Sequence, residues 1–297
     1  VMSGSAFGQI FGIPMGVVLA GQFGFRTPFY LFAATMGLTF FLLLFRLPQP
    51  QVRRREGQLT VRTAIKDYWA MLRRREIVSA SVAFFLMFFG VSLFIVYFPT
   101  WLEWSLGFTP NEVASLFLVG GIANVITGPQ AGRISDKIGR KVIVLLSCVG
   151  LFFVMLATPY VVTDLWVAYP LFFFTMVLIA MRISPFSALL TALVPDHQRG
   201  SLMGLTVALG QVGFGLGGAV AGPLYADMGY ASNTVLGAVA VLGMGLMVWF
   251  LVPEPTVKKD PGASGEDPDE SGEDPDESGE DPDGSGEDPG ESDRPEG

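Results

Sequence analysis

Residues 77–99 read IVSASVAFFLMFFGVSLFIVYFP, a run of 23 positions without a charged side chain. A helix of a soluble domain needs a polar face, whereas a helix that is apolar all round for about 20 residues matches the thickness of a bilayer core. The stretch therefore predicts a membrane-spanning helix, and similar stretches predict an all-α, polytopic membrane protein with eight transmembrane helices. Their approximate ranges are 4–21, 28–45, 77–99, 113–131, 142–159, 166–193, 201–224 and 233–252.

The charges of the chain are divided between a basic body and an acidic tail. The 297 residues carry a formal net charge of −8. From Asp260 onward there are 17 acidic residues and one base, Arg294, whereas the preceding part holds 10 acidic and 18 basic residues. A repeated Ser-Gly-Glu-Asp-Pro-Asp-Glu unit offers almost nothing apolar to bury, so we expect residues 253–297 to form a disordered acidic tail.

Basic residues follow every second span and set the expected orientation. They gather after spans two, four, six and eight, while the intervening loops contain only Arg26. Because short cytoplasmic loops collect Lys and Arg, we expect these loops and both termini on the cytoplasmic side of the cell membrane. Residues 46–76 form a central cytoplasmic loop, in which the spacing after Thr60 predicts a short interfacial helix; a solvated basic linker is the alternative.

Composition argues against enzyme and metal chemistry. His197 is the single histidine and Cys148 the single cysteine, so there is neither a histidine pair for zinc nor an intrachain disulfide. No Gly-x-Ser-x-Gly elbow, His-Glu-x-x-His motif or Walker loop occurs in the sequence. Residues 267–272 imitate the start of a calcium loop, but the twelfth position is Ser278 instead of Glu. We expect no enzymatic activity, no cofactor, no metal and no nucleic-acid partner.

Two segments 202 residues apart resemble each other. Gly8-Gln9 aligns with Gly210-Gln211, and Gly16 aligns with Gly218. Spans one and two therefore look like a copy of spans seven and eight in the same orientation. Parallel repeats of this kind belong to transporters built from two similar halves.

The segment 132–141 carries a family resemblance. It reads Gly-Arg-Ile-Ser-Asp-Lys-Ile-Gly-Arg-Lys and matches, at each fixed position, the major facilitator superfamily signature Gly-x-x-x-Asp-(Arg/Lys)-x-Gly-(Arg/Lys)-(Arg/Lys). The resemblance covers about residues 1–252 and implies that the eight spans correspond to family helices five to twelve. Residues 1–45 are then the last two helices of the N-terminal bundle, and residues 77–252 are the C-terminal six-helix bundle.

The first four helices of the family pattern are absent from this sequence, so that the implied fold is incomplete. We expect a fragment or a truncated gene product, with a functional eight-helix protein as the alternative. The resemblance implies secondary active transport of a small organic solute by alternating access, with a proton or another ion as a possible coupling partner. The alternative function is a transport-incompetent membrane scaffold or regulatory remnant.

The resemblance also implies that the 132–141 loop is a cytoplasmic conformational latch. Its residues are Gly132, Asp136, Lys137, Gly139, Arg140 and Lys141. Asp136 would bind the start of span one in one conformation and release it in the other, while the bases pair with carboxylates or membrane lipids. From its place just before span five, Asp136 could also cap exposed helix amides. The alternative is that this loop only sets the orientation.

Glycine and proline mark expected sites of helix packing and bending. Gly4, Gly8, Gly12 and Gly16 form a stripe along which another helix can approach closely, and Pro14 should bend that span. Antiporters of the family have a Gly-rich motif in helix five that this stretch matches in part, which mildly favours efflux over ordinary close packing. Gly218 and Pro185 complete the expected packing and hinge set.

Arg182 is the charged residue that lies well inside a span. A charged residue at the bilayer centre costs about 2.5–3.5 kcal/mol on insertion scales, so we expect a wet cavity or an acidic partner beside it. We expect it to bind an anionic substrate group or a titrating carboxylate; a structural arginine that snorkels towards the cytoplasm is the alternative. Gln9, Gln211 and Asn124 are expected neutral contacts of the substrate pathway, or else interhelical hydrogen-bonding residues.

Overall fold

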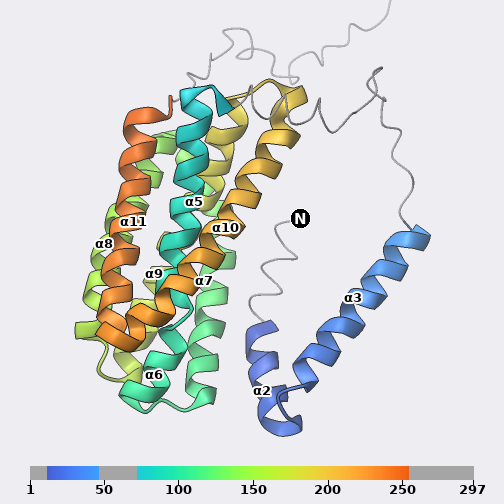
Figure 1. Cartoon of the computed structure of the whole chain (residues 1–297), viewed down its shortest axis with the longest axis vertical. Helices are drawn as coiled ribbons and strands as arrows, with labels where there is room; N and C mark the ends of the chain where they lie inside the picture. Colours follow the sequence, from blue (N-terminus) through green and yellow to red (C-terminus); the bar gives the residue numbers. More distant parts are fainter. Residues whose placement is uncertain (1–11, 47–71, 254–297) are drawn as a thin grey trace, which may run out of the picture. The chain divides into compact units, whose positions relative to one another are not determined.

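The computed structural model describes residues 12–46 and 72–253 of the chain. Within these ranges the ordered elements are helices (Figure 1). They are α2 (Ile13–Phe23), α3 (Thr27–Arg46), α5 (Arg75–Ile95), α6 (Phe98–Leu106), α7 (Pro110–Ile138), α8 (Arg140–Val161), α9 (Leu165–Ala192), α10 (Asp196–Met228) and α11 (Tyr230–Leu251). The expected interfacial helix after Thr60 and the acidic tail fall outside the described residues.

Seven helices within the described ranges are long and apolar enough to cross a membrane, counting α5 and α6 together as one span. They coincide with the second to eighth predicted spans, which confirms a polytopic all-α membrane protein. Of the first predicted span, residues 4–21, the structure describes only the part in α2. Pro14 lies in the first turn of this described part, so the bend expected at Pro14 stays a prediction.

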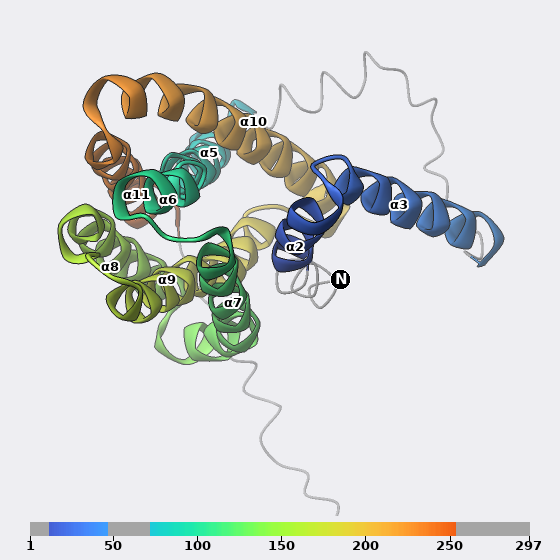
Figure 2. The same ribbon diagram turned by 90° about the horizontal axis from the view of Figure 1, so that it is seen from below.

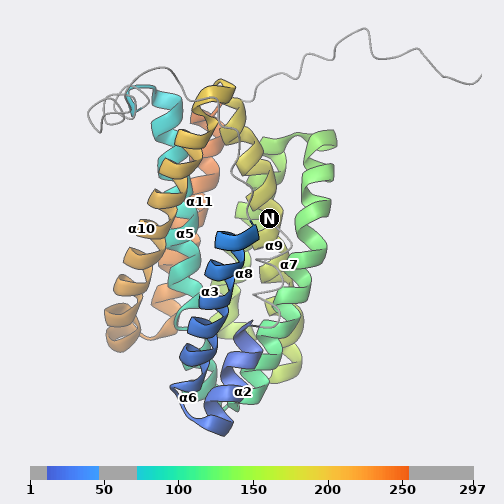
Figure 3. The same ribbon diagram turned by 90° about the vertical axis from the view of Figure 1, so that its right-hand side faces the viewer.

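Helices α5 to α11 pack as a bundle whose neighbour relations are symmetric. Helix α5 packs against α10 and α11, α9 packs against α7 and α8, and α8 packs against α11 (Figure 2). Exchanging α5 with α9, α7 with α10 and α8 with α11 maps these pairings onto themselves. Since α5 and α9 run in opposite directions through the bundle (Figure 3), the six long helices form two inverted groups of three.

Small residues allow the close contact between α10 and α5. A Cβ atom placed on Gly213 would lie 2.5 Å from the backbone oxygen of Phe85, and one on Gly217 would lie 2.7 Å from that of Phe89. The Ser92 hydroxyl donates a hydrogen bond of 2.7 Å to the Phe214 carbonyl in the same contact. Backbones that approach this closely leave no room for a side chain, as is typical of helix pairs in membranes.

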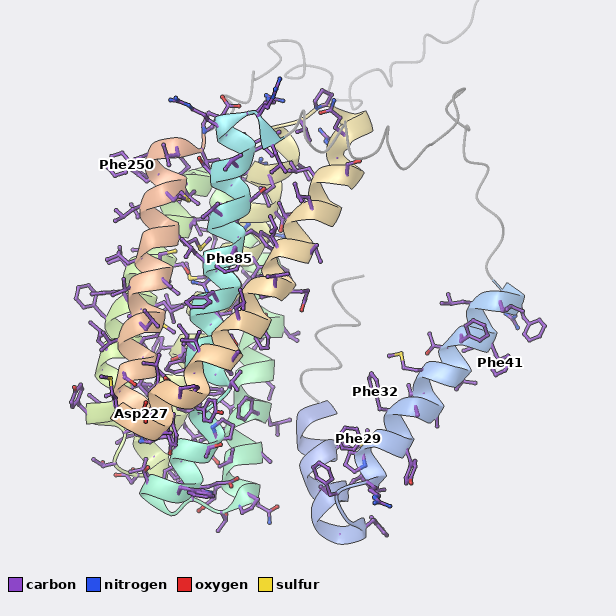
Figure 4. All side chains as sticks on the ribbon, viewed as in Figure 1. Phe29, Phe32, Phe41, Phe85, Asp227 and Phe250 are labelled. Atoms are coloured by element: carbon purple, nitrogen blue, oxygen red, sulfur yellow. The ribbon has the colours of Figure 1, made fainter. Side chains whose placement is uncertain are left out.

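Helix α3 exposes apolar side chains over its whole length. None of its residues is buried within the described structure. Figure 4 shows Phe29, Phe32 and Phe41 projecting from it, and Phe250 projecting from α11 in the same way. Such surfaces need lipid or another helix as their neighbour, in agreement with a chain that lies in a membrane.

The two ends of the bundle differ in chemistry. Trp104 and Trp166, 83% and 84% exposed, lie at the end where α5 passes into α6 and α8 into α9. The helix ends at the opposite side of the bundle carry exposed or partly exposed bases, namely Arg73, Arg74, Arg75, Arg133, Lys137, Arg140, Lys141 and Arg199. Aromatic residues favour membrane interfaces and bases favour the cytoplasmic side, so this distribution agrees with the predicted topology.

Candidate functional site

Arg182 lies in the interior of the bundle. It occupies the eighteenth position of α9, and its side chain is 0% exposed. Its Nε, Nη1 and Nη2 atoms are all buried without a hydrogen-bond partner. A guanidinium in this position has lost its hydration without receiving other hydrogen bonds in return.

The immediate polar neighbour of Arg182 is the Cys148 thiol of α8. The two groups are close enough to interact electrostatically, although no guanidinium nitrogen reaches hydrogen-bonding geometry with the sulfur. The thiol itself is directed at the Met244 sulfur of α11, 3.9 Å away. A thiol is a weak hydrogen-bond acceptor, so Cys148 does not neutralise the arginine.

None of the described acidic side chains is the partner expected beside Arg182, and the expected wet cavity stays a prediction. The described acidic side chains lie at or near helix ends, at Glu76, Glu103, Glu112, Asp136, Asp164 and Asp227. The guanidinium makes no ion pair with any of them, because a helix rises only 1.5 Å per residue and Arg182 sits ten residues from the nearer end of α9. The buried cation is therefore without a counter-charge in the described structure.

The other predicted pathway residues lie on different helices. Asn124 is half-buried on α7 and Gln211 is exposed on α10, while Gln9 lies outside the described residues. Pro185 is buried within α9, and the helix continues through it to Ala192. Because proline has no N–H group, the Met181 carbonyl, four residues before Pro185 and next to Arg182 in the chain, loses its usual partner.

The 132–141 segment is helical, which corrects the prediction of a loop. Helix α7 continues to Ile138 and α8 begins at Arg140, so Gly139 alone separates them. Its φ of 111° favours glycine and makes the sharp reversal possible. Hydropathy marks where a helix leaves the apolar core, but backbone hydrogen bonding carries α7 about two turns farther.

Asp136 does not cap α8, contrary to expectation, because it still belongs to the last turn of α7. No side chain caps the start of α8. Asp136 instead accepts hydrogen bonds from Arg140 Nε and Nη2, at 3.3 and 3.1 Å, across the Gly139 junction. This ion pair is largely exposed, with 61% of the Asp136 side chain accessible. Exposed pairs contribute less than about 1 kcal/mol, so it is weak enough to exchange partners.

Two further contacts connect the segment to other helices. Lys141 Nζ donates a hydrogen bond of 3.3 Å to the Trp249 carbonyl in the last turn of α11. A Cβ atom on Gly132 would lie 3.1 Å from the Ser184 hydroxyl of α9, two residues from Arg182. The predicted latch residues thus contact both α9 and α11, a relation that no spacing in the sequence indicated.

The glycines predicted for helix packing differ in their surroundings. A Cβ atom on Gly12 or Gly16 would meet nothing within 4 Å among the described residues, so the close approach of another helix there stays a prediction. A Cβ atom on Gly218 would lie 3.5 Å from the Ser92 hydroxyl, an ordinary contact distance. Gly8 lies outside the described residues.

The sequence of this chain is similar to the sequences of known proteins. The sequence profile of the Major Facilitator Superfamily matches residues 1–217 and, in a second alignment, residues 80–273. Among curated proteins, YceJ of Bacillus subtilis (strain 168), an uncharacterized MFS-type transporter, is 24% identical over 267 residues, which cover 89% of this chain and 66% of that protein. YwfA of the same organism, also an uncharacterized MFS-type transporter, is 26% identical over 258 residues, covering 84% of this chain and 60% of that protein.

A third relative has a more specific description. Multidrug resistance protein 2 of Bacillus subtilis (strain 168) is 29% identical over 138 residues, which cover 45% of this chain and 34% of that protein. The chain thus spans slightly less than two thirds of the length of the first two relatives.

Proposed function

The chain belongs to the Major Facilitator Superfamily, and from this premise we propose that it takes part in the transport of a small organic solute across the cell membrane by alternating access. The observation that carries the proposal is the family match over more than half of the chain, joined to a six-helix bundle of inverted groups of three. Bundles of this type rock as rigid units around a substrate site near the middle of the membrane.

We propose export as the direction of transport. The similarity to Multidrug resistance protein 2 supports this direction, as does the partial match of residues 4–16 to the antiporter motif. We propose that the basic helix ends and both termini lie on the cytoplasmic side; Lys and Arg at one end of the bundle and exposed Trp at the other support this orientation.

We propose that Arg182 binds a negatively charged group during the transport cycle. Its guanidinium is fully buried and has no hydrogen-bond partner in the described structure. A desolvated, unpaired cation in a membrane interior is unfavourable, and such residues generally mark substrate or ion pathways. An anionic group of the solute, or a carboxylate that carries the coupling proton, would supply the missing counter-charge.

The segment 132–141 is proposed to be the cytoplasmic latch. The exposed Asp136–Arg140 pair is weak, so Asp136 can exchange Arg140 for a second partner at little energetic cost. The Lys141 contact with α11 and the close approach of Gly132 to α9 would transmit that exchange to the bundle. Asn124, Gln211 and Gln9 are proposed neutral contacts of the solute.

Dye efflux from cells that express the chain tests this function. Cells are loaded with anionic carboxyfluorescein or with cationic ethidium, and the loss of dye is followed for the wild type, Arg182→Leu and Arg182→Lys. We expect Arg182→Leu to lose carboxyfluorescein efflux at least tenfold and Arg182→Lys to keep part of it. Immunoblots of the membrane fraction control for the amount of protein.

Two outcomes would contradict the proposal. Unchanged efflux by Arg182→Leu would remove Arg182 from the pathway. No efflux of either dye above empty-vector cells, with the wild-type chain fully inserted, would favour a scaffold without transport activity.

A further inference from the structure

A groove lies between α7, α8 and α9. Its volume is about 190 Å³. It is lined by Thr127, Gln130, Ala131, Ile134, Ile143, Val177 and Met181. Ala131 and Ile143 are buried, while Gln130 and Ile134 are exposed, so the groove opens sideways at the surface of the bundle.

The α7 side of the groove follows one helical stripe that ends in a cation. Thr127, Ala131 and Ile134 recur at spacings of four and three residues, which keeps them on one face of the helix. Lys137 follows the lining residue Gln130 by seven residues, or two helical turns, so it lies at the edge of that face, about 4.5 Å beyond Ile134 along the axis. On the α8 side a base also lies close to a lining residue, because Arg140 precedes Ile143 by three residues. The apolar groove therefore has two bases at its mouth.

These two bases differ in their availability. Arg140 is held by Asp136 at 3.1 Å. Lys137 is exposed and forms no ion pair with any of the described residues. The neighbouring Arg133 is also exposed, but it lies farther round α7 from the lining residues than Lys137 does. The free positive charge at the mouth is thus that of Lys137.

We propose that this groove binds one acyl chain of an anionic phospholipid, whose phosphate is bound by Lys137. The lining is mainly apolar, and the stretch from Thr127 to Ile134 spans about 10 Å along α7, enough for the upper part of an acyl chain. A phosphate at the end of α7 would lie at headgroup depth, where bases attract anionic lipids. The inference needs Lys137 at a membrane interface, but it does not rest on the proposed transport activity.

Lipid titration of the purified full chain in detergent tests the proposal. Native mass spectrometry counts the bound molecules while dioleoyl phosphatidylglycerol, dioleoyl phosphatidylcholine or glycerol phosphate is added. We expect one phosphatidylglycerol to bind more tightly than phosphatidylcholine, and glycerol phosphate, which has no acyl chain, not to bind.

Three variants separate the groove from a diffuse basic surface. Lys137→Gln should weaken phosphatidylglycerol binding about fivefold, the effect of one base near an anionic headgroup. Arg73→Gln removes the same charge from the same end of the bundle but just before α5, which does not line the groove, so its effect should stay below twofold. Gln130→Trp places a bulky side chain at the rim of the groove and should weaken binding of both phospholipids.

Several results would overturn the proposal. Equal losses in Lys137→Gln and Arg73→Gln would assign the effect to the general basic surface. Unaltered binding in Gln130→Trp would show that the acyl chain lies elsewhere. Equal affinity for the two phospholipids would remove the role of the Lys137 charge.

Discussion

Replacement of Arg182 by leucine should stabilise the protein while it removes function. The guanidinium is 0% exposed, and its three nitrogens have no hydrogen-bond partner within residues 12–46 and 72–253. On insertion scales, an arginine at the membrane centre costs about 2.5–3.5 kcal/mol, whereas leucine contributes about −0.3 to −0.6 kcal/mol. The full exchange is therefore favourable by about 3–4 kcal/mol.

The net gain should be smaller than this difference. Arg182 sits nearer one end of α9 than the other, and the shorter leucine leaves part of the arginine's volume unfilled. We expect a net stabilisation of about 2 kcal/mol. At about 2–4 °C for each kcal/mol, the apparent melting temperature should rise by about 4–8 °C.

Thermal unfolding of the purified chain in detergent, followed by circular dichroism, measures this shift. Arg182→Lys keeps the buried charge and should show no comparable gain. Arg133→Leu removes an exposed base and should stay within about 0.5 kcal/mol of the wild type. If Arg182 formed a buried ion pair with a structural role, Arg182→Leu should lower the melting temperature instead, because breaking a buried pair costs about 3–5 kcal/mol. A fall in melting temperature with Arg182→Leu would refute the assignment of an unpaired charge.

Two further predictions concern helix packing and the latch. Gly213→Ala should destabilise the bundle by about 1–3 kcal/mol, because its Cβ atom would lie 2.5 Å from the Phe85 backbone oxygen. The Cβ atom of Gly215→Ala would meet nothing within 4 Å, so this control variant should be neutral or slightly stabilising. Equal melting temperatures of the two variants would contradict the close contact between α10 and α5. Asp136→Asn should lower dye efflux severalfold. It should change the free energy of unfolding by less than about 1 kcal/mol, because the ion pair with Arg140 is exposed. A loss of stability large enough to explain the loss of efflux would show that Asp136 has a structural role instead.

Hydropathy predicted most of the fold but misplaced helix ends. Seven of the eight predicted spans are helices in the described residues. The sequence did not predict α6, which begins at Phe98 just after α5, and it placed a loop where α7 continues to Ile138. A hydropathy profile follows the thickness of the apolar core, whereas a helix ends where its backbone hydrogen bonds end, here at Gly139.

From the sequence, single residues of the candidate site could be predicted, but the contacts between them could not. A charged residue inside an apolar span is visible in any hydropathy profile, so Arg182 could be singled out. Its neighbour Cys148 lies 34 positions earlier in the chain, and the Lys141 contact with Trp249 joins residues 108 positions apart. Such pairs form only when helices pack, and no spacing along one helix indicates them.

What the sequence determined by itself is the division of the chain between membrane and water, because the transfer of each side chain into lipid depends on composition and little on its neighbours. The sequence by itself also determines the basic ends of the spans and the 132–141 motif, since both can be read from consecutive residues. Only the tertiary structure decided that Arg182 has no counter-charge among the described residues and that α7, α8 and α9 form an apolar groove. Both depend on which helix faces lie together, and in a bundle that is apolar on all sides the packing of small and large side chains selects those faces.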